Sequence, residues 1–172
     1  MYIGNIIVVN GTCGSGKTSI AECLQNNGYL AIDGDCAIQS LRCKKKVKQY
    51  EWNELIDEIL YEISLLTYFN KNIVLSHVIL PKDLGKYMQA FASYGLQYKF
   101  VTLRPDYQTA VERCKSRTAH DNITPEKWIR YFYDLLVFDE QMADTIDNTN
   151  QSIEETVAEI SNLKWRIAAP LI

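Results

Sequence analysis

The residues with the clearest chemical potential form a run near the N-terminus, Gly-Thr-Cys-Gly-Ser-Gly-Lys-Thr over 11–18. A glycine, four further residues and then Gly-Lys-Thr is the spacing of a phosphate-binding P-loop. Its glycines adopt backbone angles closed to other residues, so that successive N–H groups turn toward phosphate oxygens at the start of a helix. Lys17 adds a positive charge for the β- and γ-phosphates, and the Thr18 hydroxyl can ligate Mg²⁺. The run predicts a nucleotide site.

The segments on either side of this loop match the strand, loop and helix order that a P-loop requires. The apolar run Ile-Ile-Val-Val over 6–9 has strand length, and residues 18–26 are compatible with a helix. A glycine-rich turn followed by a chance Lys-Thr pair is the alternative, and it would not need this context. We therefore interpret residues 11–18 as a nucleotide-binding loop.

Two carboxylates follow the next predicted strand. Asp33, Gly34 and Asp35 come directly after the segment 29–32, so both acids fall at the carboxyl end of a strand, where open α/β sheets bind ligands. A carboxylate at this edge can accept the proton of an attacking hydroxyl or hold Mg²⁺ through water. Because Asp-Gly is also common in turns, a purely structural turn is the alternative.

Apolar runs of strand length alternate with helical patterns along the chain, as in a parallel sheet covered on both faces. The predicted strands are 5–10, 29–32, 72–77, 98–103 and 142–146, and the predicted helices are 52–69, 81–94, 105–117, one from 124 onward and 151–163. Thr124 is expected to cap one helix, with Pro125 in its first turn, and Ser152 to cap the last. No repeat or long linker interrupts the pattern, so we predict one domain over residues 1–172.

The composition narrows the class of ligand and the compartment. Lys and Arg number 18 against 21 Asp and Glu, a formal net charge of -3, which disfavours a general nucleic-acid binder. Five cysteines form no CxxC pair, which fits a reduced protein and gives no support for a zinc site. No apolar stretch approaches the roughly 20 residues needed to span a bilayer, and no basic leader precedes the first strand. We expect a cytoplasmic protein, monomer or homodimer, that binds small molecules and neither nucleic acid nor membrane.

A P-loop near the start of the chain, followed by Asp-Gly-Asp after the next strand, resembles the P-loop small-molecule kinases. That superfamily includes gluconate kinase, shikimate kinase, adenylylsulfate kinase, chloramphenicol phosphotransferase and the tunicamycin-resistance-like proteins. The resemblance implies the P-loop NTPase fold, a three-layer α/β/α arrangement with a five-stranded parallel sheet. It also implies ATP on the P-loop and an acceptor over the Asp-Gly-Asp end, where Asp33 and Asp35 contact the acceptor hydroxyl or the metal.

A third segment extends the resemblance to the lid of adenylate-kinase-like enzymes. Residues 101–105 (Val-Thr-Leu-Arg-Pro) end a strand in a proline, and Arg113 and Arg117 follow four residues apart on one face of a predicted helix. The resemblance implies a short lid over about 115–126, with Arg113 stacked on the adenine and Arg117 stabilising charge on the transferred group. A solvated helix face is the alternative for the two arginines.

The resemblance assigns the contacts of ATP and Mg²⁺ residue by residue. The residues expected to contact ATP are Gly11, Thr12, Cys13, Gly14, Ser15, Gly16, Lys17, Thr18, Ser19, Arg113 and Asn148. Asn148 lies in a loop, 147–150, whose backbone would pass beside the adenine. The expected metal ligands are Thr18 and Asp33, and the expected catalytic residues are Lys17, Asp33, Asp35 and Arg117. Which aspartate is the base and which the ligand of the metal or acceptor stays open.

The third predicted strand departs from related enzymes. It ends in Ser76 and His77 rather than in the aspartate that many P-loop ATPases use for the metal, so that role falls to Asp33 or Asp35. His77 can bind the acceptor, assist proton transfer or serve only as a structural hydrogen-bonding group. The next residues, Val-Ile-Leu-Pro-Lys over 78–82, lack the acidic-Gly and Arg pattern of nucleoside monophosphate kinases, which disfavours nucleotide monophosphates as acceptors.

Two further features bear on the acceptor. The basic run from Arg42 to Lys48 would suit an anionic acceptor if it covers the pocket, or it forms an exposed loop. Most aromatic residues are expected in the core, but any that faces the pocket could flank a ring-bearing acceptor. The aromatic residues in question are Tyr50, Trp52, Tyr61, Tyr68, Trp128, Tyr131, Phe132 and Tyr133.

These patterns predict an ATP-dependent kinase that transfers the γ-phosphoryl group to a hydroxyl of a small metabolite or antibiotic. Two other functions stay open. One is a kinase for a nucleoside or a nucleotide precursor, and the other is a nucleotide-binding switch or ATPase without a small-molecule acceptor. The pairing of Asp33 and Asp35 with Arg113 and Arg117 favours transfer to a second substrate.

Overall fold

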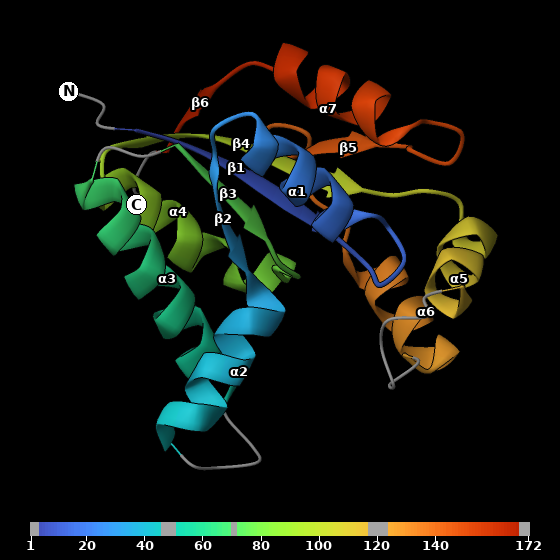
Figure 1. Cartoon of the computed structure of the whole chain (residues 1–172), viewed down its shortest axis with the longest axis horizontal. Coiled ribbons are helices and arrows are strands. Elements are labelled where there is room, and N and C mark those ends of the chain that lie inside the picture. The colour runs from blue at the N-terminus through green and yellow to red at the C-terminus, as the bar shows by residue number, and fades with distance from the viewer. Residues whose placement is uncertain (1–3, 46–50, 70–71, 117–123, 169–172) are drawn as a thin grey trace.

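A parallel β-sheet runs through the molecule (Figure 1), whose computed structural model describes residues 4–45, 51–69, 72–116 and 124–168. Five strands follow one another in the order β2-β3-β1-β4-β5, and all neighbours on this path are parallel. Their bounds are β1 Gly4–Gly11, β2 Leu30–Asp33, β3 Ile73–Ser76, β4 Leu96–Leu103 and β5 Asp144–Ile146. The predicted five-stranded parallel sheet is confirmed.

The strand order brings three of the predicted functional segments to one edge of the sheet. β1 lies at the centre, where Val9 pairs with Ser76 of β3 and with Val101 of β4. Asp33, the last residue of β2, pairs with the same Ser76. The P-loop after β1 and the acidic end of β2 therefore lie on either side of the end of β3.

Helices cover both faces of the sheet (Figure 1), because successive residues of a strand point to opposite sides. Ile6 and Val8 of β1 pack into the core with α3 and α4, whereas Ile7 and Val9 pack with α1 and α7. The bounds of these helices are α1 Lys17–Asn26, α3 Trp52–Tyr68, α4 Leu84–Ser93 and α7 Ile153–Asn162. β1 is buried on both sides, which explains its continuous apolar run.

Some helix starts differ from the sequence-based expectation. A short 3₁₀ turn, η1 (Pro81–Asp83), comes before α4, so the helix begins three residues later than Pro81 suggested. Helix α5 (Tyr107–Lys115) begins two residues later than the start expected at Pro105. Its N-cap is Asp106, whose side chain accepts from the Thr109 N–H at 2.9 Å.

The cap predicted for the helix after the proposed lid is wrong by one residue. Helix α6 (Glu126–Leu135) has Pro125 at its N-cap, with an extended ψ of 137°, and not Thr124. The cap predicted for α7 is confirmed, since Ser152 and Glu155 exchange the two hydrogen bonds of a capping box.

The segment after Asp33 is helical, which the sequence did not predict. Helix α2 (Gly34–Lys45) begins directly where β2 ends and packs on α3. Arg42 and Lys44 lie on its exposed last turn, where Lys44 forms an ion pair with Glu58 of α3. An exposed loop, one of the two alternatives for the basic run, is therefore wrong for its described part, and residues 46–48 lie outside the described residues.

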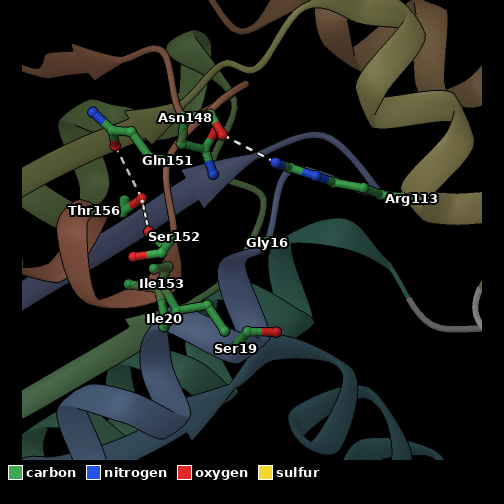
Figure 2. A pocket seen from close by; sticks show the side chains of 9 residues that line it. All are labelled: Gly16, Ser19, Ile20, Arg113, Asn148, Gln151, Ser152, Ile153 and Thr156. Carbon is green, nitrogen blue, oxygen red and sulfur yellow. Dashed lines mark hydrogen bonds between the residues drawn. The ribbon is translucent and has the colours of Figure 1, made fainter.

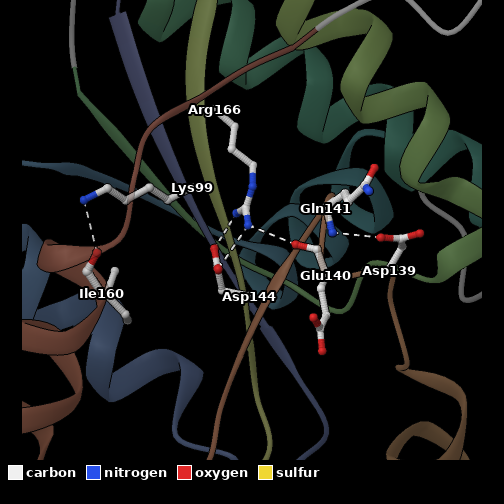
Figure 3. A network of polar contacts seen from close by, with 7 residues as sticks. All are labelled: Lys99, Asp139, Glu140, Gln141, Asp144, Ile160 and Arg166. Carbon is white, nitrogen blue, oxygen red and sulfur yellow. Dashed lines mark hydrogen bonds and ion pairs between the residues drawn. The ribbon is translucent and has the colours of Figure 1, made fainter.

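A short antiparallel strand, β6 (Arg166–Ile167), pairs with β4 beyond the predicted set. Arg166 forms an ion pair with Asp144 of β5 and donates to the Glu140 carbonyl oxygen at 3.2 Å (Figure 3). These contacts raise the pKa of Arg166, chiefly through the hydrogen bond to Asp144. They join β6 to the start of β5.

Lys99 of β4 fixes the end of α7 (Figure 3). Its ammonium donates to the carbonyl oxygens of Ile160 and Ser161 at 3.1 and 2.8 Å, and it lies 4.5 Å from the ring centre of Trp165. Burial lowers the pKa of Lys99. Because the last carbonyls of a helix lack helical partners, this buried side chain stabilises the end of α7.

None of the helices within residues 4–45, 51–69, 72–116 and 124–168 combines the length and the apolar character needed to cross a membrane.

Asn10 offers a test of how the segment after β3 is held to β1. Its fully buried side chain accepts from the Ile79 N–H at 3.0 Å and donates to the Ile79 carbonyl oxygen at 3.2 Å. Asn10→Ala should lower the free energy of unfolding by about 2 kcal/mol, because both main-chain groups lose this partner in the core. Urea denaturation measures the change.

Asn5, also in β1, is the matched control. Its amide donates to Asn72 Oδ1 at 3.1 Å at the exposed start of the strand. Asn5→Ala should cost less than about 0.5 kcal/mol, since water replaces the lost partner. Equal losses in the two variants would contradict the special role of Asn10.

Candidate active site

The predicted P-loop forms a tight turn between β1 and α1. Gly14 and Gly16 have φ angles of +80° and +98°, in the left-handed region that residues with a Cβ rarely occupy. At Gly14 the space is also closed, because a Cβ there would lie 1.9 Å from the carbonyl oxygen of Ala110 in α5. Gly14 therefore permits both the turn and its close contact with α5.

Hydrogen bonds from three side chains, two of the loop itself and one from the segment after β5, hold this loop in place. The buried Thr12 hydroxyl donates to the Ile129 carbonyl oxygen of α6 at 3.0 Å. Asn148, which is 4% exposed, donates from Nδ2 to the Ser15 carbonyl oxygen at 2.9 Å. Lys17 bends back over the loop and donates from Nζ to the Thr12 carbonyl oxygen at 2.9 Å. The loop is thus joined to α6 and to the segment after β5.

A cavity of about 290 Å³ lies beside the loop, between the starts of α1 and α7 (Figure 2). We call it the α1–α7 cavity. It is lined by Gly16, Ser19, Ile20, Arg113, Asn148, Gln151, Ser152, Ile153 and Thr156. Four residues expected to contact ATP, namely Gly16, Ser19, Arg113 and Asn148, thus meet in one cavity.

Arg113 reaches across from α5 toward the loop after β5 (Figure 2). Its Nη2 donates to the carbonyl oxygens of Asn148 and Thr149, each at 3.0 Å. The side chain is half-buried, and these bonds fix its guanidinium at the cavity. A planar cation held in this way can stack on an aromatic base.

A second cavity, of about 230 Å³, lies at the carboxyl ends of β2 and β3. We call it the strand-end cavity. It is lined by Cys13, Lys17, Thr18, Asp33, Gly34, Asp35, Ile38, Trp52, Ser76, His77, Val78 and Phe132. Lys17 and Thr18 of the P-loop are therefore brought together with both predicted carboxylates.

The two carboxylates differ in their surroundings. Asp33 Oδ1 accepts from the main-chain N–H groups of Asp35 and Cys36 at 2.8 and 3.3 Å, so it caps the first turn of α2. Asp35 lies in that first turn and is exposed. The Asp33 carboxylate is therefore partly engaged by main-chain groups, whereas Asp35 lies open to the cavity and to solvent.

His77 lines the same cavity and is only 6% exposed. Its ring stacks on Trp52, with centres 5.8 Å apart, and a Cβ at Gly34 would lie 2.1 Å from its Nδ1. Its Nε2 is buried without a hydrogen-bond partner among the described residues. Burial, and secondarily the charge of Lys17, lower the pKa of His77 to about 4. The imidazole is therefore neutral near pH 7.

Some predicted site residues lie outside these cavities or outside the described residues. Arg117 and most of the expected lid over 115–126 are outside the described residues. Lys115 and Glu126, the first and last residues of that expected lid, form an ion pair at 3.3 Å. Arg42 and Lys44 line neither cavity. Within the described ranges, no three His, Cys, Asp or Glu side chains gather as a metal cluster.

Sequence reasoning left two parts of the cavity walls without a specific assignment. Trp52 and Phe132 were among eight candidate aromatics, and only their packing between distant helices selects them for the strand-end cavity. Gln151 and Thr156 line the α1–α7 cavity because α7 begins beside α1. The predicted Ser152 cap, which marks the start of α7 in the sequence, was the one signal that could have pointed to them.

The comparisons with known proteins agree with this geometry. A family model described as chloramphenicol phosphotransferase-like protein matches residues 4–163. The chain belongs to the chloramphenicol phosphotransferase-like family. No curated protein matches it by sequence. The P-loop resemblance expected from the motifs is thus confirmed at the level of the family.

Solved structures share the fold of this family member. A gluconokinase from Sinorhizobium meliloti 1021 matches with a TM-score of 0.63 and 22% identity, over 93% of this chain and 91% of that one. The tunicamycin resistance protein of Deinococcus radiodurans matches with a TM-score of 0.71 and 19% identity, over 94% of this chain and 98% of that one. A sugar kinase from Janibacter sp. HTCC2649 matches with a TM-score of 0.69 and 16% identity, over 97% of this chain and 96% of that one. The fold is that of the P-loop small-molecule kinases.

Gly14→Ala tests the shape of the loop against a matched control, Gly28→Ala. Both glycines have positive φ, +80° and +93°, but a Cβ at Gly28 has no atom within 4 Å. Both variants should carry a backbone cost of about 1 kcal/mol. Gly14→Ala should in addition lose nucleotide affinity at least tenfold, because the loop must move away from Ala110.

Isothermal titration with ATP and thermal unfolding together measure these effects. Gly28→Ala should bind ATP like the parent protein. Full ATP affinity in Gly14→Ala would show that this loop does not hold the nucleotide.

The buried His77 predicts a pH dependence of stability. Its pKa is about 4 in the folded protein and ordinarily 6.5, so the unfolded chain takes up the proton first as the pH falls. Its contribution to stability is complete above pH 6.5 and is lost progressively toward pH 4, about 2 kcal/mol of it by pH 5. His77→Gln cannot titrate and should lose correspondingly less stability between pH 7.5 and pH 5 in urea denaturation. Parallel losses in both proteins would contradict this account.

Proposed function

We propose that this protein is an ATP-dependent kinase that transfers the γ-phosphoryl group to a hydroxyl of a small metabolite or antibiotic. The observation that carries this proposal is the strand-end cavity, where the P-loop residues Lys17 and Thr18 line the same space as Asp33 and Asp35. A nucleotide loop that shares a cavity with carboxylates has the parts needed for transfer to a second substrate.

The two cavities suggest how the substrates are divided. Gly16 lines the α1–α7 cavity and its neighbour Lys17 lines the strand-end cavity, so the start of α1 separates them. We infer that the base of ATP occupies the α1–α7 cavity beside Arg113. The acceptor would occupy the strand-end cavity, and the transferred group would lie near Lys17, whose charge offsets that of the phosphates.

In this proposal one carboxylate accepts the proton of the acceptor hydroxyl. The hydroxyl oxygen bonds to the γ-phosphorus as the bond to the bridging oxygen of ADP breaks, and the hydroxyl proton passes to Asp35 or Asp33. The exposed Asp35 is the better candidate for the base, because two main-chain N–H groups already bind Asp33 Oδ1.

The residues present fit Mg²⁺ as a partner of the phosphates. Thr18 offers a hydroxyl and Asp33 a carboxylate, both at the strand-end cavity, and both are oxygen donors of the kind that Mg²⁺ prefers. The absence of a denser group of ligands within the described ranges suits an ion held mainly by phosphates and water. When bound, Mg²⁺ would neutralise charge on the phosphates.

A nucleoside or nucleotide-precursor kinase is the second candidate. The aromatic side chains of Trp52 and Phe132 on the strand-end cavity favour it over a switch without an acceptor, because a nucleoside carries a flat ring. A nucleotide-binding switch would need the P-loop but would have no use for the second cavity.

The decisive experiment measures ATP consumption with and without a panel of sugars, nucleosides and antibiotics. Asp35→Asn should lower transfer to the best acceptor at least about a hundredfold, as expected for loss of a general base, while ATP binding stays within about twofold. Asp57→Asn, on the exposed side of α3, is the matched control and should keep full activity.

Lys17→Ala should abolish transfer without unfolding the protein, because the charge that meets the phosphates is lost. ATP hydrolysis that no acceptor accelerates, or full transfer in both Asp35→Asn and Asp33→Asn, would contradict the proposed kinase.

A further inference from the structure

Trp52 is an aromatic side chain on the strand-end cavity that has no role in the P-loop or the carboxylate pair. It is the first residue of α3, and its ring is half-buried at the cavity wall. The helix start is fixed by a capping box, in which Glu51 and Glu54 exchange hydrogen bonds with each other's main chain. The main chain that carries Trp52 is therefore held in place.

The indole itself is held at two points. Its Nε1 donates to Asp83 Oδ2 at 2.7 Å, and its ring lies on the His77 ring at an interplanar angle of 24°. Asp83 is 6% exposed, so this hydrogen bond to a charged acceptor is shielded from water. The orientation of the indole is thus set by groups from η1 and from the end of β3.

Asp83 is the last residue of η1, and its main chain continues into α4 with helical angles of φ −97° and ψ −13°. A capping side chain belongs to a residue with non-helical angles, so the Asp83 carboxylate does not cap α4. It accepts from the Trp52 indole instead. The same charge raises the pKa of the neighbouring Tyr87, in addition to the effect of burial. The Trp52 indole is thus a hydrogen-bond partner of a buried carboxylate, which sets the position of the ring.

The remaining walls of the cavity favour a flat and uncharged ligand. Phe132 of α6 adds a second ring, from a helix on the other side of the strand ends from α3 (Figure 1), and Ile38 and Val78 add apolar surface. Among the described residues, the lining of this cavity has two carboxylates, Asp33 and Asp35, and one cation, Lys17. The described basic residues at the end of α2 do not line it.

Charge therefore disfavours an anionic acceptor. The ATP phosphates would already occupy Lys17, which leaves Asp33 and Asp35 facing any carboxylate or phosphate on the acceptor. This contrasts with the anionic acceptor that the basic run Arg42 to Lys48 had suggested from the sequence.

We propose that Trp52 selects the acceptor, as a stacking platform for an alcohol that carries a flat ring and no negative charge, and that Asp83 is the residue that positions it. This inference rests on the proposed kinase function for the identity of the ligand as acceptor. The stacking itself does not depend on catalysis.

Three probes separate the ring from the charge: phenyl β-D-glucoside, glucose and gluconate. Calorimetry in the presence of ADP and Mg²⁺ would give their dissociation constants for the full chain. The phenyl glucoside should bind about tenfold more tightly than glucose, as one aromatic stacking contact allows, and gluconate should bind most weakly.

Variants of Trp52 then assign the preference to this ring. Trp52→Leu should reduce the phenyl preference to less than twofold with unchanged affinity for ADP, whereas Trp52→Phe should retain part of it. Trp128→Leu removes a half-exposed tryptophan on α6 that lines neither cavity, and it should leave the preference intact.

Variants of Asp83 test the positioning role without removing the ring. Asp83→Ala should reduce the phenyl preference at least threefold, and Asp83→Asn, which keeps an acceptor oxygen for the indole, should restore most of it. If Trp52→Leu fails to fold, as judged by thermal unfolding, this pair decides the question.

The inference is overturned if the parent protein shows no phenyl preference, if gluconate binds as well as the phenyl glucoside, or if the preference survives in both Trp52→Leu and Asp83→Ala. Failure of the kinase proposal looks different. In that case the phenyl preference and its loss in the variants persist, but no probe accepts phosphate from ATP.

Discussion

The arrangement at the carboxyl edge of the sheet depends on buried hydrogen bonds that hold the P-loop main chain in one shape. Thr12 binds the main chain of α6, and Asn148 binds the Ser15 carbonyl oxygen from the segment after β5. A buried carbonyl without such a partner would favour a loosened loop, at a cost of about 1–3 kcal/mol. Because the loop is fixed from segments more than a hundred residues away, its position relative to both cavities is fixed as well.

This constraint explains why two cavities open on either side of the first turn of α1. Gly16 lines one and Lys17 the other, although they are adjacent in the chain. A helix start points neighbouring residues in different directions, so a single loop can contact two ligands. The contacts of Lys99 and Arg166 with α7 and β5 lie farther away, but they hold the elements that carry the second wall of the α1–α7 cavity.

The strand-end cavity combines charge and aromatic surface, and on this combination rests our proposal of a small uncharged acceptor. His77 stays neutral because burial lowers its pKa, so the negative charge of Asp33 and Asp35 is offset by Lys17 alone among the described lining residues. The Asp83 carboxylate gives no charge to the cavity lining and instead orients Trp52. Chemistry and selection would thus be carried by different residues of one pocket.

The sequence by itself determined the parts of this protein that are local. The Gly-Lys-Thr spacing, the buried run of β1 and the Ser152 cap could be read directly, because each depends on contacts within a few residues. The alternation of predicted strands and helices along the chain also predicted a parallel sheet covered on both faces.

Only the tertiary structure decided what lies beside these parts. Helix α2 was not predicted, because Asp33 caps it through main-chain groups that no periodicity reveals. Arg42 and Lys44, from the described part of the basic run, do not line the strand-end cavity. Trp52, one of eight candidate aromatics, does line it and is held by Asp83, 31 residues away. Such choices depend on which side chains distant elements bring within a few ångströms, and a single sequence carries no record of those distances.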